Sequence, residues 1–453
     1  MSTDSRTLVF ASMPIRQAVL KQIIPAIFSQ MIALLYSLAD TYFVGMLNVP
    51  AQTAAITIVY PSFVMLTAIS NLFGIGGASL VARKLGKKEV QDAKEAASIS
   101  FWLGLLAAIL FSLLFLLLAR PLLTLCGATE TTYDFCFSYA KWVVVFGGIP
   151  TIMNTLLANL VRSEGAAASA SFGVSLGGIL NIILDPLFIL PRFLGLGVVG
   201  AGMATALSNL VSMVYFLLYL YHRKHNTVLN ITPSYLKQTG KHLRAILSIG
   251  FPSALQYALT VVAVAAQSAF VAKYTTEATA ALGIVKKLDQ LPLYFSIGVA
   301  NGLLPLLAFN HSAGNETRRR NAFRFGTAIS VGFALLCVII YECFAPQLAS
   351  LFISDQQTIT YGASFLRRMV LAMPFMAFCY PMIIQFQAMG KVQEALVTSI
   401  LRKGVLDVPL LFLMDGLFPL YGCMWVQPIV DFISLIVASG FYLRLQKGEH
   451  HAI

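Results

Sequence analysis

Charged residues are scarce in this 453-residue chain: Asp, Glu, Lys and Arg together make up 11% of it, whereas 58% of its residues are hydrophobic. A soluble domain carries about 25% charged residues, so water is not the main solvent of this protein. Alternating strands of about ten residues are absent from the sequence, which excludes a transmembrane barrel. Runs of about 20 apolar residues recur along the whole length instead, and they predict an all-α polytopic membrane protein.

Motifs of several other protein classes are also missing. The six cysteines form no CxxC pair, which argues against a disulfide framework or a cysteine metal site. No GxxxxGK[ST] motif occurs, which argues against an ATP-driven pump. The six histidines fall in links and at the tail, without a nucleophile or a metal partner, so we expect no enzyme, no cofactor and no structural metal.

Twelve apolar segments can be counted. We expect helices near 15–45, 53–82, 95–119, 134–161, 167–191 and 197–221, and then near 243–272, 281–309, 322–344, 361–387, 394–418 and 421–445. The predicted fold has twelve transmembrane helices in two pseudo-symmetric six-helix bundles. We divide the chain into an N-terminal segment 1–14, an N-lobe 15–221, a cytoplasmic linker 222–242, a C-lobe 243–445 and a tail 446–453.

The net charge of +12 comes mostly from Lys and Arg in the links between apolar runs. The positive-inside rule explains such a distribution and favours cytoplasmic termini, so we expect a multi-pass monomer in the cell (inner) membrane and no nucleic-acid partner. The basic links include Arg83, Lys84, Lys87 and Lys88 after the second helix. Lys391, Arg402 and Lys403 lie around the link between the tenth and eleventh helices.

The two halves of the chain look like copies of one unit. Pro25 precedes Asp40 by 15 residues, and Pro252 precedes Gln267 by 15. The stretches 74–93, 117–129 and 149–165 have counterparts, in the same order, at 302–322, 342–355 and 373–390. Duplication of about six helices is a common plan of secondary transporters, with the binding cavity between the lobes. The copies differ at one aligned position, where the first half has Asp40 and the second half has the neutral Gln267. We therefore expect ion coupling in the N-lobe.

Asp40 is the ionisable group inside the first apolar run. A carboxylate at the bilayer centre costs roughly 2.5–3.5 kcal/mol on insertion scales, so such a residue is functional by default. Helical spacing places it on one face with Tyr36, Ala33 and Ser29. We expect Asp40 to be the ion-coupling group of a transporter. The alternative is a buried Asp that only caps or hydrogen-bonds a neighbouring helix.

A second polar group lies in the fifth segment, LNIILDPLFIL. Asn181 and Asp185 are spaced i, i+4 on one helix face, and Pro186 frees a backbone carbonyl at that depth. Thr205 in the glycine-rich sixth segment can reach the same pocket. Two carboxylates near one another inside protein do not both stay ionised at low cost, so the pair is either a proton acceptor or, with Asn181 and Thr205, an oxygen ligand set for sodium. An Asp-Pro corner at a helix end is the structural alternative.

The stretches ADTYFVG, RKLGKKEVQDA, NIILDPLFI, GVVGAGMATALSN and GFPSAL resemble the MATE (multidrug and toxic compound extrusion) transporters, and the first-lobe carboxylates resemble the DinF-like branch. The resemblance covers Pro25 to about Leu445. It implies two six-helix bundles around a V-shaped cavity, drug/cation antiport, and Pro25 as a hinge in the first helix. The residues that match the coupling site of the family are Asp40, Tyr36, Asn181, Asp185, Thr205 and, on the fourth helix, Tyr139. The glutamate that NorM-like members carry in the seventh helix is missing here.

Substrates of such a transporter are small amphipathic, mainly cationic drugs or dyes, for which methionine and aromatic side chains are suited. The candidate cavity residues are Ser29, Met31, Ala33, Met65, Phe146 and Met153. The coupling ion is H⁺ in the first interpretation and Na⁺ in the second. A flippase for lipid-linked precursors is a further alternative, which needs a strongly basic cavity. The second-lobe carboxylates Asp289, Asp407 and Asp431 look isolated and structural.

Overall fold

The computed structural model describes the backbone of residues 8–450 and the side chains of residues 8–446, so parts of the predicted terminal segments 1–14 and 446–453 lie outside it. Within this range the chain forms helices and no strands. The first bundle comprises α2 (Ile15–Gly45), α3 (Pro50–Gly86), α4 (Val90–Leu125), α5 (Tyr133–Ala140), η1 (Lys141–Phe146), α6 (Gly148–Ser163), α7 (Ala167–Ile189) and α8 (Val198–Arg223).

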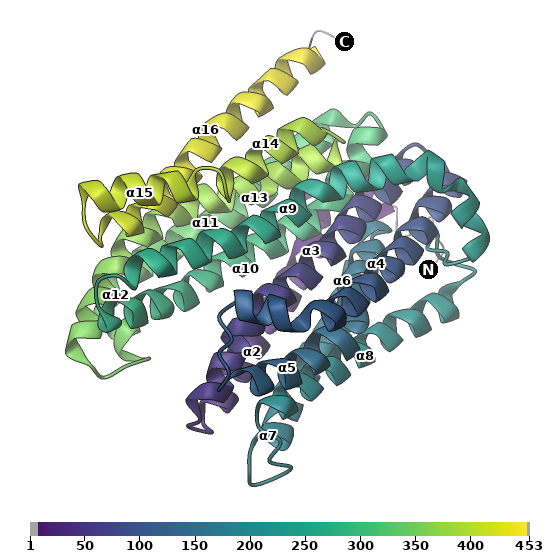
Figure 1. Ribbon diagram of the computed structural model, residues 1–453. Helices are drawn as coiled ribbons and strands as arrows, with labels where there is room; N and C mark the ends of the chain where they lie inside the picture. Colours follow the sequence, from purple (N-terminus) through teal and green to yellow (C-terminus); the bar gives the residue numbers. More distant parts are fainter. Residues whose placement is uncertain (1–7, 451–453) are drawn as a thin grey trace.

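The second bundle follows a link that contains the short η2 (Pro233–Gln238). It comprises α9 (Thr239–Val271), α10 (Thr276–Ser312), α11 (Glu316–Ser350), α12 (Gln356–Met369), η3 (Val370–Ala372), α13 (Met373–Ala388), α14 (Val392–Arg402), α15 (Asp407–Leu417) and α16 (Gly422–His450). Figure 1 shows the two bundles meeting where α3, α9 and α10 run together, and diverging toward the far ends of α7, α12 and α15. The all-α fold in two bundles is therefore confirmed.

Most helices are longer than the apolar runs that predicted them. The second, for example, was expected at 53–82 and spans Pro50–Gly86, because polar turns at its ends continue the helix into the interface. Ten helices of the described range are long and apolar enough to cross a membrane, and α5–η1 with α6, bent by 45°, makes an eleventh span.

The eleventh expected helix, 394–418, is wrong as one continuous element. It is divided into α14 and α15, of 11 residues each. Lys403 adopts an extended backbone conformation, and Gly404 has a φ of +125°, which side-chain-bearing residues rarely adopt. The backbone N–H of Gly404 donates to Asp407 Oδ2 at 2.7 Å, so Asp407 stabilises the start of α15.

The duplication is visible in the turns of the two lobes. Gly165, two residues after the end of α6, has a φ of +91°, and Gly390, two residues after the end of its counterpart α13, has a φ of +72°. Both left-handed glycines terminate a helix in the way that a C′ position favours. The fourth membrane segment of each lobe is also irregular at a similar place, with η1 just before α6 in the N-lobe and η3 just before α13 in the C-lobe.

Glycines allow the two lobes to pack closely where they meet. A Cβ added to Gly250 of α9 would lie 1.8 Å from the Leu72 carbonyl oxygen of α3, and one added to Gly76 of α3 would lie 2.1 Å from the Ile246 carbonyl oxygen of α9. Gly298 and Gly302 of α10 stand in similar contact with the first half of α2. These backbone-to-backbone contacts close one end of the molecule, and the second half of α2 packs on α7 instead.

Candidate functional site

Asp40 of α2 and Asp185 of α7 lie together inside the N-lobe. Both are buried, and the Asp40 carboxyl lies beside the side chains of Asp185 and Thr205. Asn181 Nδ2 donates to Asp185 Oδ1 at 3.3 Å and to Thr205 Oγ1 at 3.4 Å. Four side chains from α2, α7 and α8 thus form one cluster, which we call the N-lobe acidic site: Asp40, Asn181, Asp185 and Thr205.

Small residues bring these helices close enough for the cluster to form. A Cβ on Gly178 of α7 would lie 2.5 Å from the Ile32 side chain and 3.3 Å from the Tyr36 ring, so α2 fits directly against this glycine. A Cβ on Gly177 would lie 2.2 Å from Ser212 Oγ of α8. Gly202 of α8 faces the Tyr139 ring and backbone. The glycine face that continues Asn181 and Asp185 is therefore a packing surface for two helices at once.

The N-lobe acidic site offers oxygen atoms without donors. Asp40 Oδ1, Asp185 Oδ2 and Asn181 Oδ1 are buried and have no hydrogen-bond partner among the described residues. In that range neither carboxylate forms an ion pair with Lys, Arg or His. Two buried carboxylates in contact need a proton or a cation between them. The donor set consists of oxygen atoms only, which suits a proton or a hard cation such as sodium.

Tyrosines from both lobes lie near this site. Tyr36 and Tyr139 lie within electrostatic range of both carboxylates. Tyr294 of α10 lies within the same range of four other tyrosines, and all five are at least partly exposed. We call this group the tyrosine cluster: Tyr36, Tyr60, Tyr257, Tyr294 and Tyr380. The sequence analysis identified only Tyr36 of these five; the signal for the others was tyrosine at mid-membrane positions, away from the interfacial ends where it usually sits.

The other candidate cavity residues fall in different environments. Ser29 is buried, and its hydroxyl donates to the Ala26 carbonyl at 2.9 Å. Met153 is 1% exposed in the N-lobe core. Met65 and Phe146 are 36% and 53% exposed, and the Phe146 ring packs on Trp142. The structure thus gives Ser29 and Met153 packing positions, while Met31, Ala33, Met65 and Phe146 retain exposed surface.

Pro25 lies in the part of α2 that the C-lobe holds. The helix continues through Pro25 without a break from Ile15 to Gly45. Ile23 and Ile27, on either side of this proline, contact Gly302 and Gly298 of α10. A proline removes one helical hydrogen bond, so it weakens α2 within the stretch that packs on α10.

A protein-family model described as MatE matches residues 25–187 and 252–413, which is more than half of the chain. This chain belongs to the MatE family. The two matched stretches begin at Pro25 and Pro252, the residues that align the halves in the sequence, so the internal duplication agrees with the match. The predicted MATE membership is thus confirmed, and with it a transporter rather than an enzyme.

Relatives of this MatE-family chain match over nearly its whole length. The multidrug export protein MepA of Staphylococcus saprophyticus subsp. saprophyticus is 28% identical over 436 residues, which cover 96% of this chain and 95% of MepA. MepA of Staphylococcus aureus strain MSSA476 is 27% identical over 437 residues, with the same coverage. A crystal structure of a MATE in the bent conformation superposes with a TM-score of 0.89 at 25% identity, covering 100% of this chain and 99% of that one.

Another similar structure is described as the outward-facing conformation of a multidrug resistance MATE family transporter of the MOP superfamily. It superposes with a TM-score of 0.88 at 25% identity and covers 96% of both chains. The arrangement of two diverging bundles is therefore the arrangement of solved MATE transporters.

The C-lobe carboxylates of this MatE-family chain are not isolated, contrary to the sequence-based expectation. Asp431 Oδ1 lies 3.2 Å from Arg402 Nε, and both side chains are 1% exposed. Gln427 Nε2 donates to Asp431 Oδ2 at 2.6 Å. Asp289 lies within electrostatic range of Lys286, Arg402, Lys403 and Asp431. Arg402 and Lys403 are thus part of the C-lobe interior. The sequence analysis had instead placed them at a link between helices.

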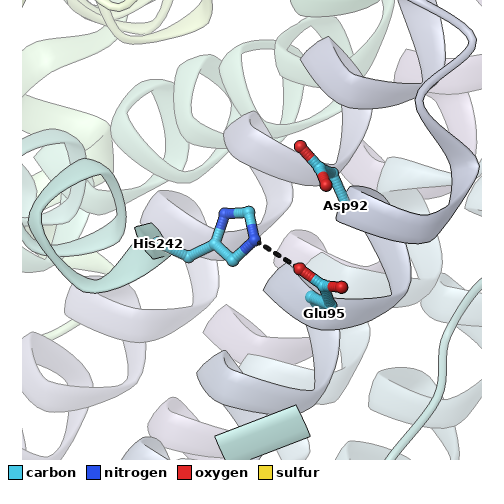
Figure 2. A group of neighbouring side chains, drawn as sticks. All are labelled: Asp92, Glu95 and His242. Atoms are coloured by element: carbon cyan, nitrogen blue, oxygen red, sulfur yellow. Dashed lines mark hydrogen bonds and ion pairs between the residues drawn. The ribbon is translucent and has the colours of Figure 1, made fainter. Parts of the chain in front are cut away.

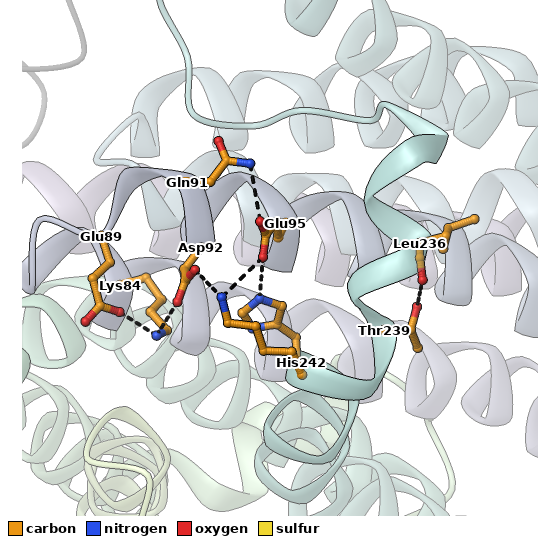
Figure 3. A network of polar contacts seen from close by, with 9 residues as sticks. Lys84, Glu89, Gln91, Asp92, Glu95, Leu236, Thr239 and His242 are labelled. Atoms are coloured by element: carbon orange, nitrogen blue, oxygen red, sulfur yellow. Dashed lines mark hydrogen bonds and ion pairs between the residues drawn. The ribbon is translucent and has the colours of Figure 1, made fainter.

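A second polar network joins the lobes at the end where they meet. Figure 2 shows His242 of α9 pointing at Glu95 of α4, with His242 Nε2 and Glu95 Oε2 2.9 Å apart. Figure 3 shows Lys84 between Glu89 and Asp92: Lys84 Nζ lies 2.7 Å from Asp92 Oδ2 and also binds Glu89. On the other side, Lys241 Nζ lies 2.6 Å from Asp92 Oδ1. We call Lys84, Asp92, Glu95, Lys241 and His242 the inter-lobe network.

The inter-lobe network corrects the expectation that no histidine meets a metal-type ligand set. Ligand atoms of Asp92, Glu95 and His242 lie within 4.8 Å of one another. Lys84 and Lys241 already neutralise Asp92, so we interpret this group as an ion-pair network and not as a metal site. The link that precedes α9 is also held against α4. Ser98 Oγ and Trp102 Nε1 of α4 donate to the carbonyls of Thr232 and Ile231, each at 2.9 Å.

Proposed function

We propose that this protein is a secondary active multidrug exporter of amphipathic, mainly cationic compounds, coupled to proton entry through Asp40. Family membership and the MepA relatives, which are named multidrug export proteins, support the transport of drugs. The observation that carries the coupling is the contact of two buried carboxylates that have unpaired oxygens and no basic partner among the described residues. Such a pair holds a cation in one state and releases it in another.

The physical basis of exchange is competition for negative charge. Asp40 lies one helical turn from Tyr36, which belongs to the tyrosine cluster. A cationic aromatic compound that stacks on tyrosine rings gains about 0.5–2 kcal/mol per cation–π contact, and its charge is neutralised by a deprotonated Asp40. Proton uptake at Asp40 removes that charge and weakens binding. One proton that enters down a gradient therefore displaces one cationic substrate.

The conformational part of the proposal uses the packing of α2. The lobes are closed where Gly250 and Gly302 meet α3 and α2. Substrates would then reach the site from the other end of the molecule, where the bundles diverge (Figure 1). We place the closed end and both termini in the cytoplasm, by the positive-inside rule, in the cell membrane. Alternating access then requires the glycine contacts and the inter-lobe network to separate. Pro25 gives α2 the local weakness for this movement.

Sodium coupling at the same residues is the second candidate, because the site has an oxygen-only donor set. A lipid-precursor flippase is less well supported. The basic residues inside the C-lobe are matched by three carboxylates and make no net positive cavity among Lys286, Asp289, Arg402, Lys403, Asp407 and Asp431.

Inverted membrane vesicles with a cationic fluorescent dye test the proposal. We expect dye uptake to be driven by an imposed pH gradient at fixed sodium and to collapse with a protonophore. Uptake that resists the protonophore and follows a sodium gradient would reverse the ion assignment. Uptake that follows neither gradient would contradict secondary active transport.

A further inference from the structure

The duplication places a counterpart of the N-lobe acidic site inside the C-lobe. Lys403, Asp407 and Gln427 each lie 222 positions after Asn181, Asp185 and Thr205. Gly422 lies 222 positions after Gly200, and both glycines pack on the backbone of the preceding helix: their Cβ positions would lie 1.9 Å from the Met414 carbonyl oxygen and 2.5 Å from that of Phe188. Gln267 is the counterpart of Asp40 through the Pro25–Pro252 alignment.

The structure brings these four counterparts together. Gln267, Lys403, Asp407 and Gln427 line one cavity of about 20 Å³, which is room for one water-sized group. The Lys403 ammonium donates to Gln427 Oε1. This bond joins the same two repeat positions as the Asn181–Thr205 bond of the N-lobe. The C-lobe cavity is therefore the repeat of the N-lobe acidic site, with different residues at three of its four positions.

The substitutions change the charge of the site. The N-lobe positions carry two carboxylates and no cation, whereas the C-lobe positions carry one carboxylate and one ammonium. The groups around Lys403 are Asp407 of α15, Asp289 and Lys286 of α10, Asp431 of α16 and Arg402 of α14. Cys379 and Tyr380 of α13, and Tyr257 of α9, are the remaining titratable neighbours of Arg402.

We propose that Lys403 is a tethered counter-ion: its ammonium takes, in the C-lobe, the place that an exchanged cation takes in the N-lobe. Only the N-lobe site then exchanges an ion during transport. With Lys403 the interior cluster has three positive and three negative groups, and without it one negative charge would stay buried without compensation. A buried uncompensated carboxylate is costly and takes up a proton or a metal cation from solution. The inference rests on the proposed function for its N-lobe half.

The test uses the full-length protein in detergent, in an Asp40→Asn/Asp185→Asn background that silences the N-lobe site. The melting temperature is measured from pH 5.5 to 8, in sodium and in potassium chloride at equal ionic strength. We expect Lys403→Asn, which installs the N-lobe residue, to create a new cation dependence: the melting temperature rises by roughly 2 °C or more with sodium or with falling pH. Lys403→Arg keeps the charge and all other titratable groups, so its ion dependence should equal that of the background.

Two further variants decide the outcome. Lys403→Asn/Asp407→Asn removes both charges and should lose the new dependence. A monodisperse Lys403→Asn protein that shows the ion dependence of Lys403→Arg would overturn the inference. If Lys403→Asn does not fold, proton release is measured on binding of a cationic dye: Asp407→Asn should release the same number of protons as the unmodified protein, and a smaller number contradicts the inference. Loss of proton release on Asp40→Asn tests the proposed function separately.

Discussion

At the scale of single residues, the site depends on where one carboxylate lies. Asp40 is five positions from the end of α2, and its neighbours across the helix interface are side chains of α7 and α8. Its charge therefore faces protein and not lipid, as the proposed coupling role requires. The same residue type elsewhere on the chain has a different role: Asp355 stabilises the first turn of α12 through the Thr358 N–H at 2.8 Å.

Asp40→Asn should abolish dye export, because an amide neither binds a proton nor balances the charge of a cationic substrate. We expect at least a tenfold loss of transport with normal amounts of protein in the membrane. Asp134→Asn is the matched control, since Asp134 is an exposed carboxylate at the start of α5. Normal export by the Asp40 variant, or equal loss in both, would remove Asp40 from the mechanism.

Helical spacing predicted the contacts within one helix of the site, but not the contacts between different helices. The i, i+4 relation of Asn181 and Asp185 is a property of one helix, so it could be read directly. Arg402 and Asp431 lie on different helices, and nothing in their spacing shows the 3.2 Å contact between them. The four further members of the tyrosine cluster were missed for the same reason, since they come from four different helices.

At the scale of elements, glycine positions set how closely the lobes pack. The contacts of Gly250 and Gly76 bring the α3 and α9 backbones together, and they involve carbonyl groups that side-chain movement does not relieve. The break between α14 and α15 shows the limit of hydropathy: the residues from 394 to 418 read as one apolar run, and the extended backbone of Lys403 and the positive φ of Gly404 divide them.

Gly250→Ala should force α9 away from α3, because its Cβ would lie 1.8 Å from the Leu72 carbonyl oxygen. We expect a destabilisation of roughly 1–3 kcal/mol in the free energy of unfolding and reduced export. Gly332→Ala is the control, since a Cβ at Gly332 of α11 would meet nothing within 4 Å. A lower melting temperature for Gly332→Ala than for Gly250→Ala would refute this description of the interface.

The inter-lobe network predicts coupling between α4 and α9. Glu95→Gln and His242→Asn each break the same contact, so their effects on the free energy of unfolding should not add. We expect an interaction energy of about 0.5–3 kcal/mol in a double-mutant cycle measured by thermal unfolding. Lys241→Met and Glu130→Gln, which lie in different ion pairs, provide an additive control pair. An additive result for Glu95 and His242 would show that the 2.9 Å contact contributes no energy.

At the scale of the whole molecule, the two lobes share a fold but differ in charge. Composition predicted the membrane class, and repeated apolar runs predicted two bundles, because both are averages over many residues. The sequence did not show that the C-lobe repeat of the acidic site contains a lysine, because the repeat had to be aligned through the structure. This difference in charge underlies the proposal that ions exchange in one lobe while a fixed charge occupies the other.

The measurement that tests this account most directly is proton release on substrate binding. Purified protein in weakly buffered detergent solution, with potassium as the only metal ion, is titrated with a cationic dye while pH is recorded. The account predicts about one proton released per dye bound, and none from Asp40→Asn. Dye binding by the unmodified protein without proton release, or undiminished release from Asp40→Asn, would contradict it.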